Sequence, residues 1–214
     1  MVYDYTYYYT SLTIIYLLIV LATYVCINNW HHLKKTKEWI FLPFFGFTII
    51  IEIISEYYVE VLNSSPAYLL DIYTLLSIIF AIYWFYSYLK LKALASISII
   101  IVVVSYLLNL YDVSIYNNEL PALAIASALI ITVNVFIFFN QILLKNNINK
   151  FKLHRPFWIA LGLFVWHINS MPFVLFLPNL NRLTWQVSGV LVFINVIMYG
   201  CFIYGLRIKQ TYDD

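Results

Sequence analysis

The sequence predicts an all-α integral membrane protein with seven transmembrane helices, its N-terminus outside and its C-terminus in the cytoplasm. Three observations lead to this prediction: the composition, seven long apolar runs, and the placement of nearly all basic residues in alternate linkers. Of the 214 residues, 64% are hydrophobic and 10% are charged, whereas soluble domains are about 45–50% apolar and about 25% charged. The composition therefore excludes a water-soluble globular domain.

The apolar runs have the length of membrane-spanning helices. A hydrocarbon core of about 30 Å requires roughly 20 residues at a rise of 1.5 Å each, and a helix satisfies its own backbone hydrogen bonds in lipid. We expect a single transmembrane domain over residues 1–214 and no soluble domain, so that any cytoplasmic output needs a partner protein. The seven expected helices cover residues 11–29, 39–61, 67–89, 93–111, 120–144, 156–177 and 183–206.

The linkers determine the expected orientation, because Lys and Arg are enriched on the cytoplasmic side of membrane proteins. With seven spans, all but one of the 12 Lys and Arg residues fall on the side of the C-terminus, and Arg182 is the exception. This pattern predicts multi-pass insertion in a cell membrane with the N-terminus outside. The basic residues on the expected cytoplasmic side are Lys34, Lys35, Lys37, Lys90, Lys92, Lys145, Lys150, Lys152, Arg155, Arg207 and Lys209.

The second and third expected helices carry acidic residues in or near the membrane. Glu52, Glu56 and Glu60 are spaced by four, which places them on one face of the helix at 39–61. Ionisable groups inside a span cost roughly 2.5–3.5 kcal/mol each on insertion scales, so they are candidate functional residues. An alternative is that Glu56 and Glu60 lie in headgroup water and only Glu52 is buried, hydrogen-bonded as a neutral acid. Asp71, near the outer end of 67–89, is expected to extend the same acidic pocket.

The fourth and fifth expected helices contain fewer candidate functional residues. The run at 93–111 is apolar without polar alternation, as in Ile97–Val104. The helix at 120–144 has alanines at four-residue spacing, which favours close helix packing. Its polar residues Asn134, Asn140 and Gln141 fall in the inner half, either as interhelical hydrogen bonds or as the lining of a path.

The sixth expected helix, 156–177, holds the densest group of polar residues, which includes His167 and Asn169. Pro172 has no amide hydrogen to donate to the carbonyl of Ile168, so the helix is expected to kink there and to act as a hinge. The alternative reading is structural, because prolines are common in membrane helices and Ser170 can satisfy the freed backbone.

The seventh expected helix, 183–206, places Asn195 near the middle of the membrane. Counted from the outer helix ends, Glu52, His167 and Asn195 lie at depths of about 14, 15 and 16 Å. Matched depth suggests that Glu52 and His167 share a proton or a ligand, although a neutral, hydrogen-bonded core histidine is the alternative. The absence of Lys from this helix excludes a retinal Schiff base, and the scattered histidines predict no metal site.

Two segments resemble small seven-span bacterial inner-membrane proteins. They are Tyr68–Leu75 at the start of the third helix, and Pro156–Ile159 with Gly162 in the sixth. The resemblance implies the same seven-span topology and a bacterial inner membrane, and it implies no activity.

The residues favour a sensing, receptor-like module with an outward-facing acidic pocket that signals through a cytoplasmic or membrane partner protein. The alternative is a transporter or channel that uses the same carboxylates for a proton, a cation or a small solute. A membrane-embedded enzyme comes third, since no nucleophile and base pair is visible. We expect no cofactor, no metal and no nucleic-acid partner. The ligand- or proton-binding candidates are Glu52, Glu56, Asp71, His167, Asn169 and Asn195, with Pro172 as the hinge.

Overall fold

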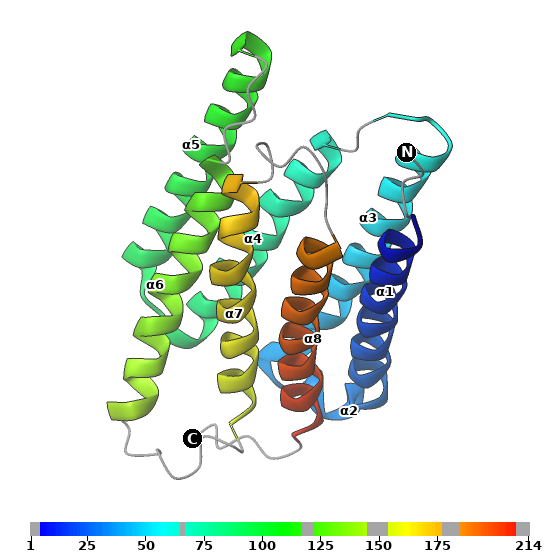
Figure 1. Cartoon of the computed structure of the whole chain (residues 1–214). Coiled ribbons are helices and arrows are strands. Elements are labelled where there is room, and N and C mark those ends of the chain that lie inside the picture. The colour runs from blue at the N-terminus through cyan, green and yellow to red at the C-terminus, as the bar shows by residue number, and fades with distance from the viewer. Residues whose placement is uncertain (1–4, 65–66, 117–121, 145–153, 177–184, 209–214) are drawn as a thin grey trace.

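The computed structural model of the chain describes residues 5–64, 67–116, 122–144, 154–176 and 185–208 (Figure 1). Within these ranges every regular element is a helix, so the all-helical prediction is confirmed for them. The elements are α1 (Tyr5–Asn28), α2 (Trp30–Leu33), the short 3-10 helix η1 (Lys37–Ile40), α3 (Phe41–Glu60), α4 (Ala67–Leu89), α5 (Lys92–Tyr116), α6 (Ala122–Leu144), α7 (Arg155–Phe176) and α8 (Trp185–Arg207).

Each expected apolar run coincides with a long helix, with the largest differences at the start of α1 and the end of α5. In the described part of the chain, six helices are long and apolar enough to cross a membrane. Their length and composition are those of a multi-pass membrane protein. The six segments are Tyr9–Asn28, Lys37–Glu60, Tyr68–Leu89, Lys92–Leu110, Ala122–Ile142 and Ser188–Arg207.

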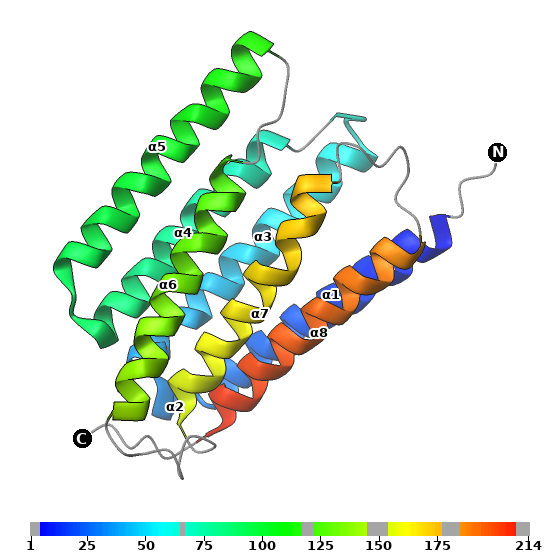
Figure 2. The same cartoon turned by 60° about the vertical axis from the view of Figure 1, so that its left-hand side comes forward.

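Six of the long helices form a closed ring. Going round it, α1 packs against α3, α3 against α4, α4 against α6, α6 against α7, α7 against α8, and α8 against α1. The remaining long helix, α5, packs outside the ring against α4 and α6 (Figures 1 and 2). The first and last helices are therefore neighbours, and α7 is a wall of the ring.

Two glycines bring α7 and α8 close together. A Cβ atom added to Gly162 would lie 3.0 Å from the backbone oxygen of Met198 and 3.1 Å from Cβ of Cys201. At Gly205 it would lie 3.2 Å from the backbone oxygen of Arg155. Small residues of this kind permit close backbone approach between membrane helices, and here they hold α7 firmly against α8.

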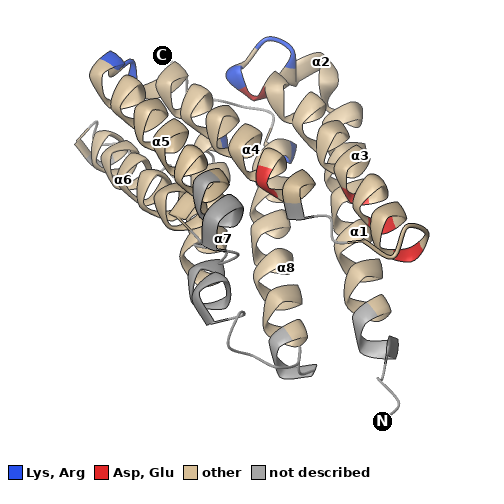
Figure 3. Cartoon of the chain, turned by 90° about the horizontal axis from the view of Figure 1, so that it is seen from above, with Lys and Arg blue, Asp and Glu red and all other residues tan. Residues whose placement is uncertain are grey.

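The two ends of the bundle carry opposite charges. Consecutive long helices run in opposite directions (Figure 2), and Figure 3 shows Lys and Arg at the end near α2, with Asp and Glu along α3 and near the start of α4. We call these the basic end and the acidic end. At the basic end lie Lys34, Lys35, Lys37, Lys90, Lys92, Arg155 and Arg207, and toward the acidic end lie Glu52, Glu56, Glu60 and Asp71.

Candidate functional site

A cavity of about 300 Å³ lies inside the ring. All six ring helices contribute to its lining, and no described residue of α5 does. The lining is largely apolar and aromatic, with polar groups from α3, α4, α6, α7 and α8. The polar and phenolic residues are Thr48, Glu52, Tyr73, Thr74, Ser77, Ser127, His167, Asn195 and Tyr199.

Three of the residues proposed from the sequence meet in this cavity. Glu52 comes from α3, His167 from α7 and Asn195 from α8. Their similar depth along different helices, inferred from residue counting, is consistent with one shared cavity. Asn195 is buried, and Glu52 and His167 are half-buried. A carboxyl, an imidazole and a carboxamide therefore border the same space.

Other proposed site residues lie outside the lining. Glu56 and Asp71 are half-buried toward the acidic end, and Asn169 is exposed with its amide donating to the carbonyl of Val165 at 2.7 Å. Pro172 lies within α7, but its side chain and that of Ser170 are outside the described residues. The hinge at Pro172 therefore stays a prediction. Arg182 also falls outside the described residues.

The helix backbone holds two of the polar side chains in place. The Nδ1 atom of His167 lies 2.8 Å from the carbonyl oxygen of Leu163, one turn earlier in α7. Because a carbonyl only accepts, Nδ1 carries a proton, and Nε2 of the neutral ring is an acceptor. Asn195 likewise donates through Nδ2 to the carbonyl of Leu191 at 2.9 Å, which leaves its Oδ1 as an acceptor.

Hydroxyl groups extend the polar lining of α3 and α4. Thr48 donates through Oγ1 to the carbonyl of Phe44 at 3.0 Å, and its Oγ1 lies 3.3 Å from the phenolic oxygen of Tyr73. Since Thr48 has one hydroxyl proton, Tyr73 is the donor in that pair. Ser77 donates to the backbone carbonyl of Tyr73 at 2.7 Å. The contact between Thr48 and Tyr73 connects α3 and α4 one helical turn from Glu52, on the side of the basic end.

Thr48 and Ser77 are lining residues that the sequence did not single out, although a signal for them exists. Phe44, Thr48 and Glu52 are spaced by four, as are Tyr73, Ser77 and Ala81, and all six line the cavity. The polar stripe of α3 extends outward from Glu52 to Glu56 and Glu60. Followed in the opposite direction, the same spacing leads into the cavity.

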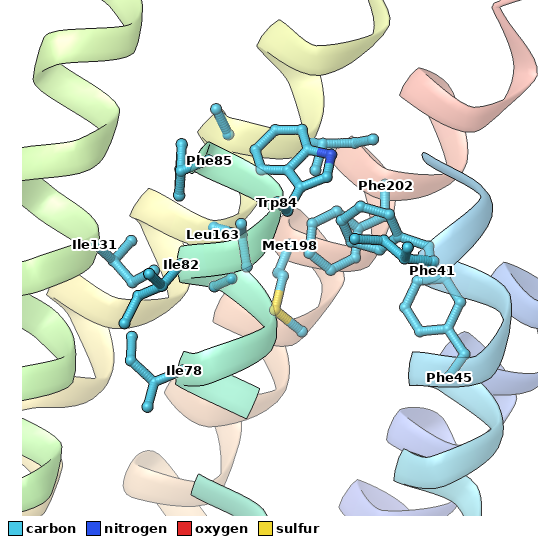
Figure 4. Close-up of a cluster of buried hydrophobic side chains, with 14 of the residues drawn as sticks. Phe41, Phe45, Ile78, Ile82, Trp84, Phe85, Ile131, Leu163, Met198 and Phe202 are labelled. Carbon is cyan, nitrogen blue, oxygen red and sulfur yellow. The ribbon is translucent and has the colours of Figure 1, made fainter. Parts of the chain in front are cut away.

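An aromatic layer separates the cavity from the basic end. We define this layer as Phe41, Phe45, Trp84 and Phe202, each at most 1% exposed. Figure 4 shows these side chains converging from α3, α4 and α8. The ring centroid of Phe41 lies 5.9 Å from that of Trp84 and 5.7 Å from that of Phe202. Such dense packing leaves little room for water between the cavity and η1.

A buried ion pair lies between the aromatic layer and the basic end. Nη1 of Arg155 is 3.3 Å from Oε2 of Glu38, and their side chains are 1% and 0% exposed. Arg155 also donates to Oγ1 of Thr36 at 3.2 Å and to the carbonyl of Ile208, while the hydroxyl of Tyr88 donates to Glu38. We call these five residues the inner clamp.

The inner clamp corrects the role assigned to Arg155. The sequence reasoning counted it with the linker residues that set orientation, but it is the first residue of α7 and is buried. Its partners come from the segment between α2 and α3 and from the chain after α8, and Tyr88 of α4 joins the group through its hydrogen bond to Glu38. A signal was present in Glu38, the one acid inside an otherwise basic linker.

No protein-family model, curated protein or solved structure matches this chain. In the described part of the chain, no group of three or more His, Cys, Asp or Glu side chains is arranged to hold a metal ion. The groups that border the cavity are the carboxyl of Glu52, the imidazole of His167, the carboxamide of Asn195 and several aromatic rings.

Proposed function

We propose that this chain is a seven-span sensing module of a bacterial inner membrane. In this proposal the cavity around Glu52, His167 and Asn195 binds a small ligand that enters from outside. The inner clamp then transmits occupancy to a protein partner in the cytoplasm or the membrane. The observation that carries the proposal is a cavity bordered by all six ring helices and separated from the basic end by the aromatic layer.

The position of α7 supports seven spans. This helix packs along both α6 and α8 and supplies Leu163, Trp166 and His167 to the cavity. A helix that closes a ring of membrane-spanning neighbours needs to lie at the same depth as they do. The proposed orientation, with the N-terminus outside, rests on the basic end and on the preference of Lys and Arg for the cytoplasm.

Access from the acidic end is supported by α3. Beyond Glu52, Glu56 is half-buried and Glu60 is exposed, so carboxylates continue from the cavity toward that end. Toward the basic end, the lining is followed by the aromatic layer and the inner clamp. The inner amides Asn134, Asn140 and Gln141 do not line the cavity, which favours a binding pocket over a continuous path.

A cation- or proton-coupled transporter is the second candidate. The inner clamp favours it, because its ion pair and hydrogen bonds connect four chain segments. These contacts can break and re-form as a gate during alternating access. In that case the described conformation is the one with the basic end closed.

Side-specific labelling of a cavity cysteine tests the proposed function without knowledge of the ligand. The background is a variant in which the two free cysteines, Cys26 and Cys201, are replaced by Ala. Ser77→Cys then places a thiol in the cavity lining. A membrane-impermeant thiol reagent is applied to right-side-out and to inside-out vesicles. A sensing module is expected to label only from the outside, since the aromatic layer blocks the other route.

Three matched variants calibrate this experiment. Glu60→Cys and Lys35→Cys, both at exposed positions, are expected to label only from the outside and only from the inside, respectively. Leu76→Cys, next to Ser77 but exposed on the outer surface of the bundle, is expected to resist the reagent in lipid. Labelling of Ser77→Cys from both sides would favour the transporter instead.

A further inference from the structure

We infer that the cavity binds a small organic cation of the alkylammonium class. The inference deepens the proposed function, since it depends on the cavity being the ligand site. It combines three features of the described lining: one carboxylate, no lysine or arginine, and six aromatic side chains.

The charge of the lining favours a cation. Glu52 carries the only carboxylate among the lining residues, and within the described residues it makes neither an ion pair nor a hydrogen bond. Even a half-buried carboxylate without a partner is costly inside a membrane, where such groups are normally paired. A positively charged ligand next to Glu52 would supply the missing partner.

The aromatic side chains favour an organic cation with alkyl groups. Ring faces attract ammonium groups through their quadrupole, most strongly where water is excluded. The rings are also differently oriented: Phe44 and Phe80 are stacked with centroids 4.4 Å apart, whereas Tyr199 and Phe202 are perpendicular at 6.0 Å. The six aromatic lining residues are Phe44, Tyr73, Phe80, Trp166, Tyr199 and Phe202.

Other ligand classes fit less well. Ca²⁺ and Mg²⁺ prefer about six or more oxygen ligands, whereas this lining is mainly carbon and aromatic. An anion would be repelled by Glu52 and would find no Lys or Arg in the lining, the groups that usually recognise carboxylates and phosphates. The volume of about 300 Å³ is at the lower end of the range for ligand pockets. It therefore favours a compact cation.

Binding of a charged and a neutral probe of the same shape tests this inference. The full chain in nanodiscs is titrated calorimetrically with choline, with tetramethylammonium, and with the neutral isostere of choline in which carbon replaces nitrogen. We expect both ammonium probes to bind and the neutral isostere to bind about tenfold or more weakly, because it loses the cation–π and carboxylate attraction. Equal binding of choline and its isostere would overturn the inference.

Matched variants locate the probe. Glu52→Gln is expected to weaken choline binding about tenfold or more, and Trp166→Leu to weaken it several-fold. Glu56→Gln, one turn away and outside the lining, is expected to weaken it much less than Glu52→Gln does. Choline affinity retained in Glu52→Gln would overturn the inference. If Glu52→Gln does not fold, the comparison of the two isosteric probes on the unmodified chain still decides.

The ammonium-binding test and the Ser77→Cys labelling test can fail independently of each other. If no ammonium probe binds but Ser77→Cys labels only from the outside, the cation inference is overturned while the outward-facing pocket stands. If ammonium probes bind with the stated dependence on Glu52 and Ser77→Cys labels from both sides, the ligand class stands and the sensing role is overturned.

Discussion

Arg155 and Glu38 show how a single residue pair can define one end of the bundle. Burying two charges costs several kcal/mol each unless their attraction and additional hydrogen bonds compensate. Here Thr36, Tyr88 and the carbonyl of Ile208 provide those bonds. Nε of Arg155 has no hydrogen-bond partner among the described residues. The pair therefore acts mainly to fix which segments meet, and its net contribution to stability is smaller than its geometry suggests.

Breaking the pair on one side is expected to be far more harmful than removing it. Glu38→Gln leaves the buried guanidinium without its counter-charge, so we expect a loss of about 3–5 kcal/mol in the free energy of unfolding. The double variant Glu38→Met/Arg155→Met is expected to recover most of that loss. The measurement is unfolding by SDS titration in mixed micelles, with Glu56→Gln as the control. Additive losses in the double variant would contradict the buried pair.

At the residue scale, the sequence predicted which polar groups are unusual but not all of their surroundings. Depth counting placed Glu52, His167 and Asn195 at one level, and these three line one cavity. Counting along a helix does not determine how each helix is rotated or which helices are neighbours. Glu56 was assigned to the pocket by its four-residue spacing and Asp71 by its place near the outer end of its helix, and neither lines the cavity.

Among the elements, α7 and α8 are the pair whose contact is most sensitive to volume. The missing side chain of Gly162 lets the backbone of α8 approach at Met198, where even a methyl group would be crowded at 3.0 Å. The same helices carry His167 and Asn195 into the cavity. A displacement of α7 relative to α8 therefore changes the spacing between these two polar groups.

Adding one methyl group to this contact is expected to destabilise the fold. Gly162→Ala should lower the free energy of unfolding by about 1–3 kcal/mol, because the backbone oxygen of Met198 cannot rotate away. Gly200→Ala on α8 is the matched control, since an added Cβ there would meet no atom within 4 Å. Thermal unfolding in detergent measures both. If the two variants have the same melting temperature, the close contact is not present.

The helical elements were the most predictable feature of the molecule. Length and continuous apolarity indicate a membrane helix because each residue must satisfy its backbone within the segment. Lateral order is different: nothing in the apolar runs indicates that α4 packs against α6 or that α5 lies outside the ring. Likewise, a count of charges by linker assigns Arg155 to a side of the membrane but says nothing about its burial.

For the whole molecule, the separation of charge between the two ends is the feature with the broadest consequence. Exposed lysines gather at the basic end, while the carboxylates of α3 and α4 lie toward the acidic end. Of these groups, only the basic residues contribute strongly to orientation in the membrane. The proposed topology therefore depends on a few short linkers.

Removing positive charge from the first linker is expected to disturb orientation. A fluorescent protein fused after Asp214 is expected to fold and fluoresce, because the C-terminus is proposed to be cytoplasmic. Replacing Lys34, Lys35 and Lys37 by Gln is expected to lower the fluorescent fraction, since linkers near the first helix usually dominate. Replacing Glu56 and Glu60 by Gln is the control and should leave it unchanged. A non-fluorescent parent fusion would contradict the proposed orientation.

The contact between α1 and α8 bears on how the chain is made. Helices enter the membrane in order during synthesis. One neighbour of α1 in the ring is α8, which is synthesised after all the other described helices. Until α8 arrives, the ring is open and the faces of Glu52 and His167 border lipid or a chaperone. Contacts so distant in sequence form late and slowly. The chain is therefore most vulnerable to degradation in the interval after the six earlier long helices have been inserted and before α8 closes the ring.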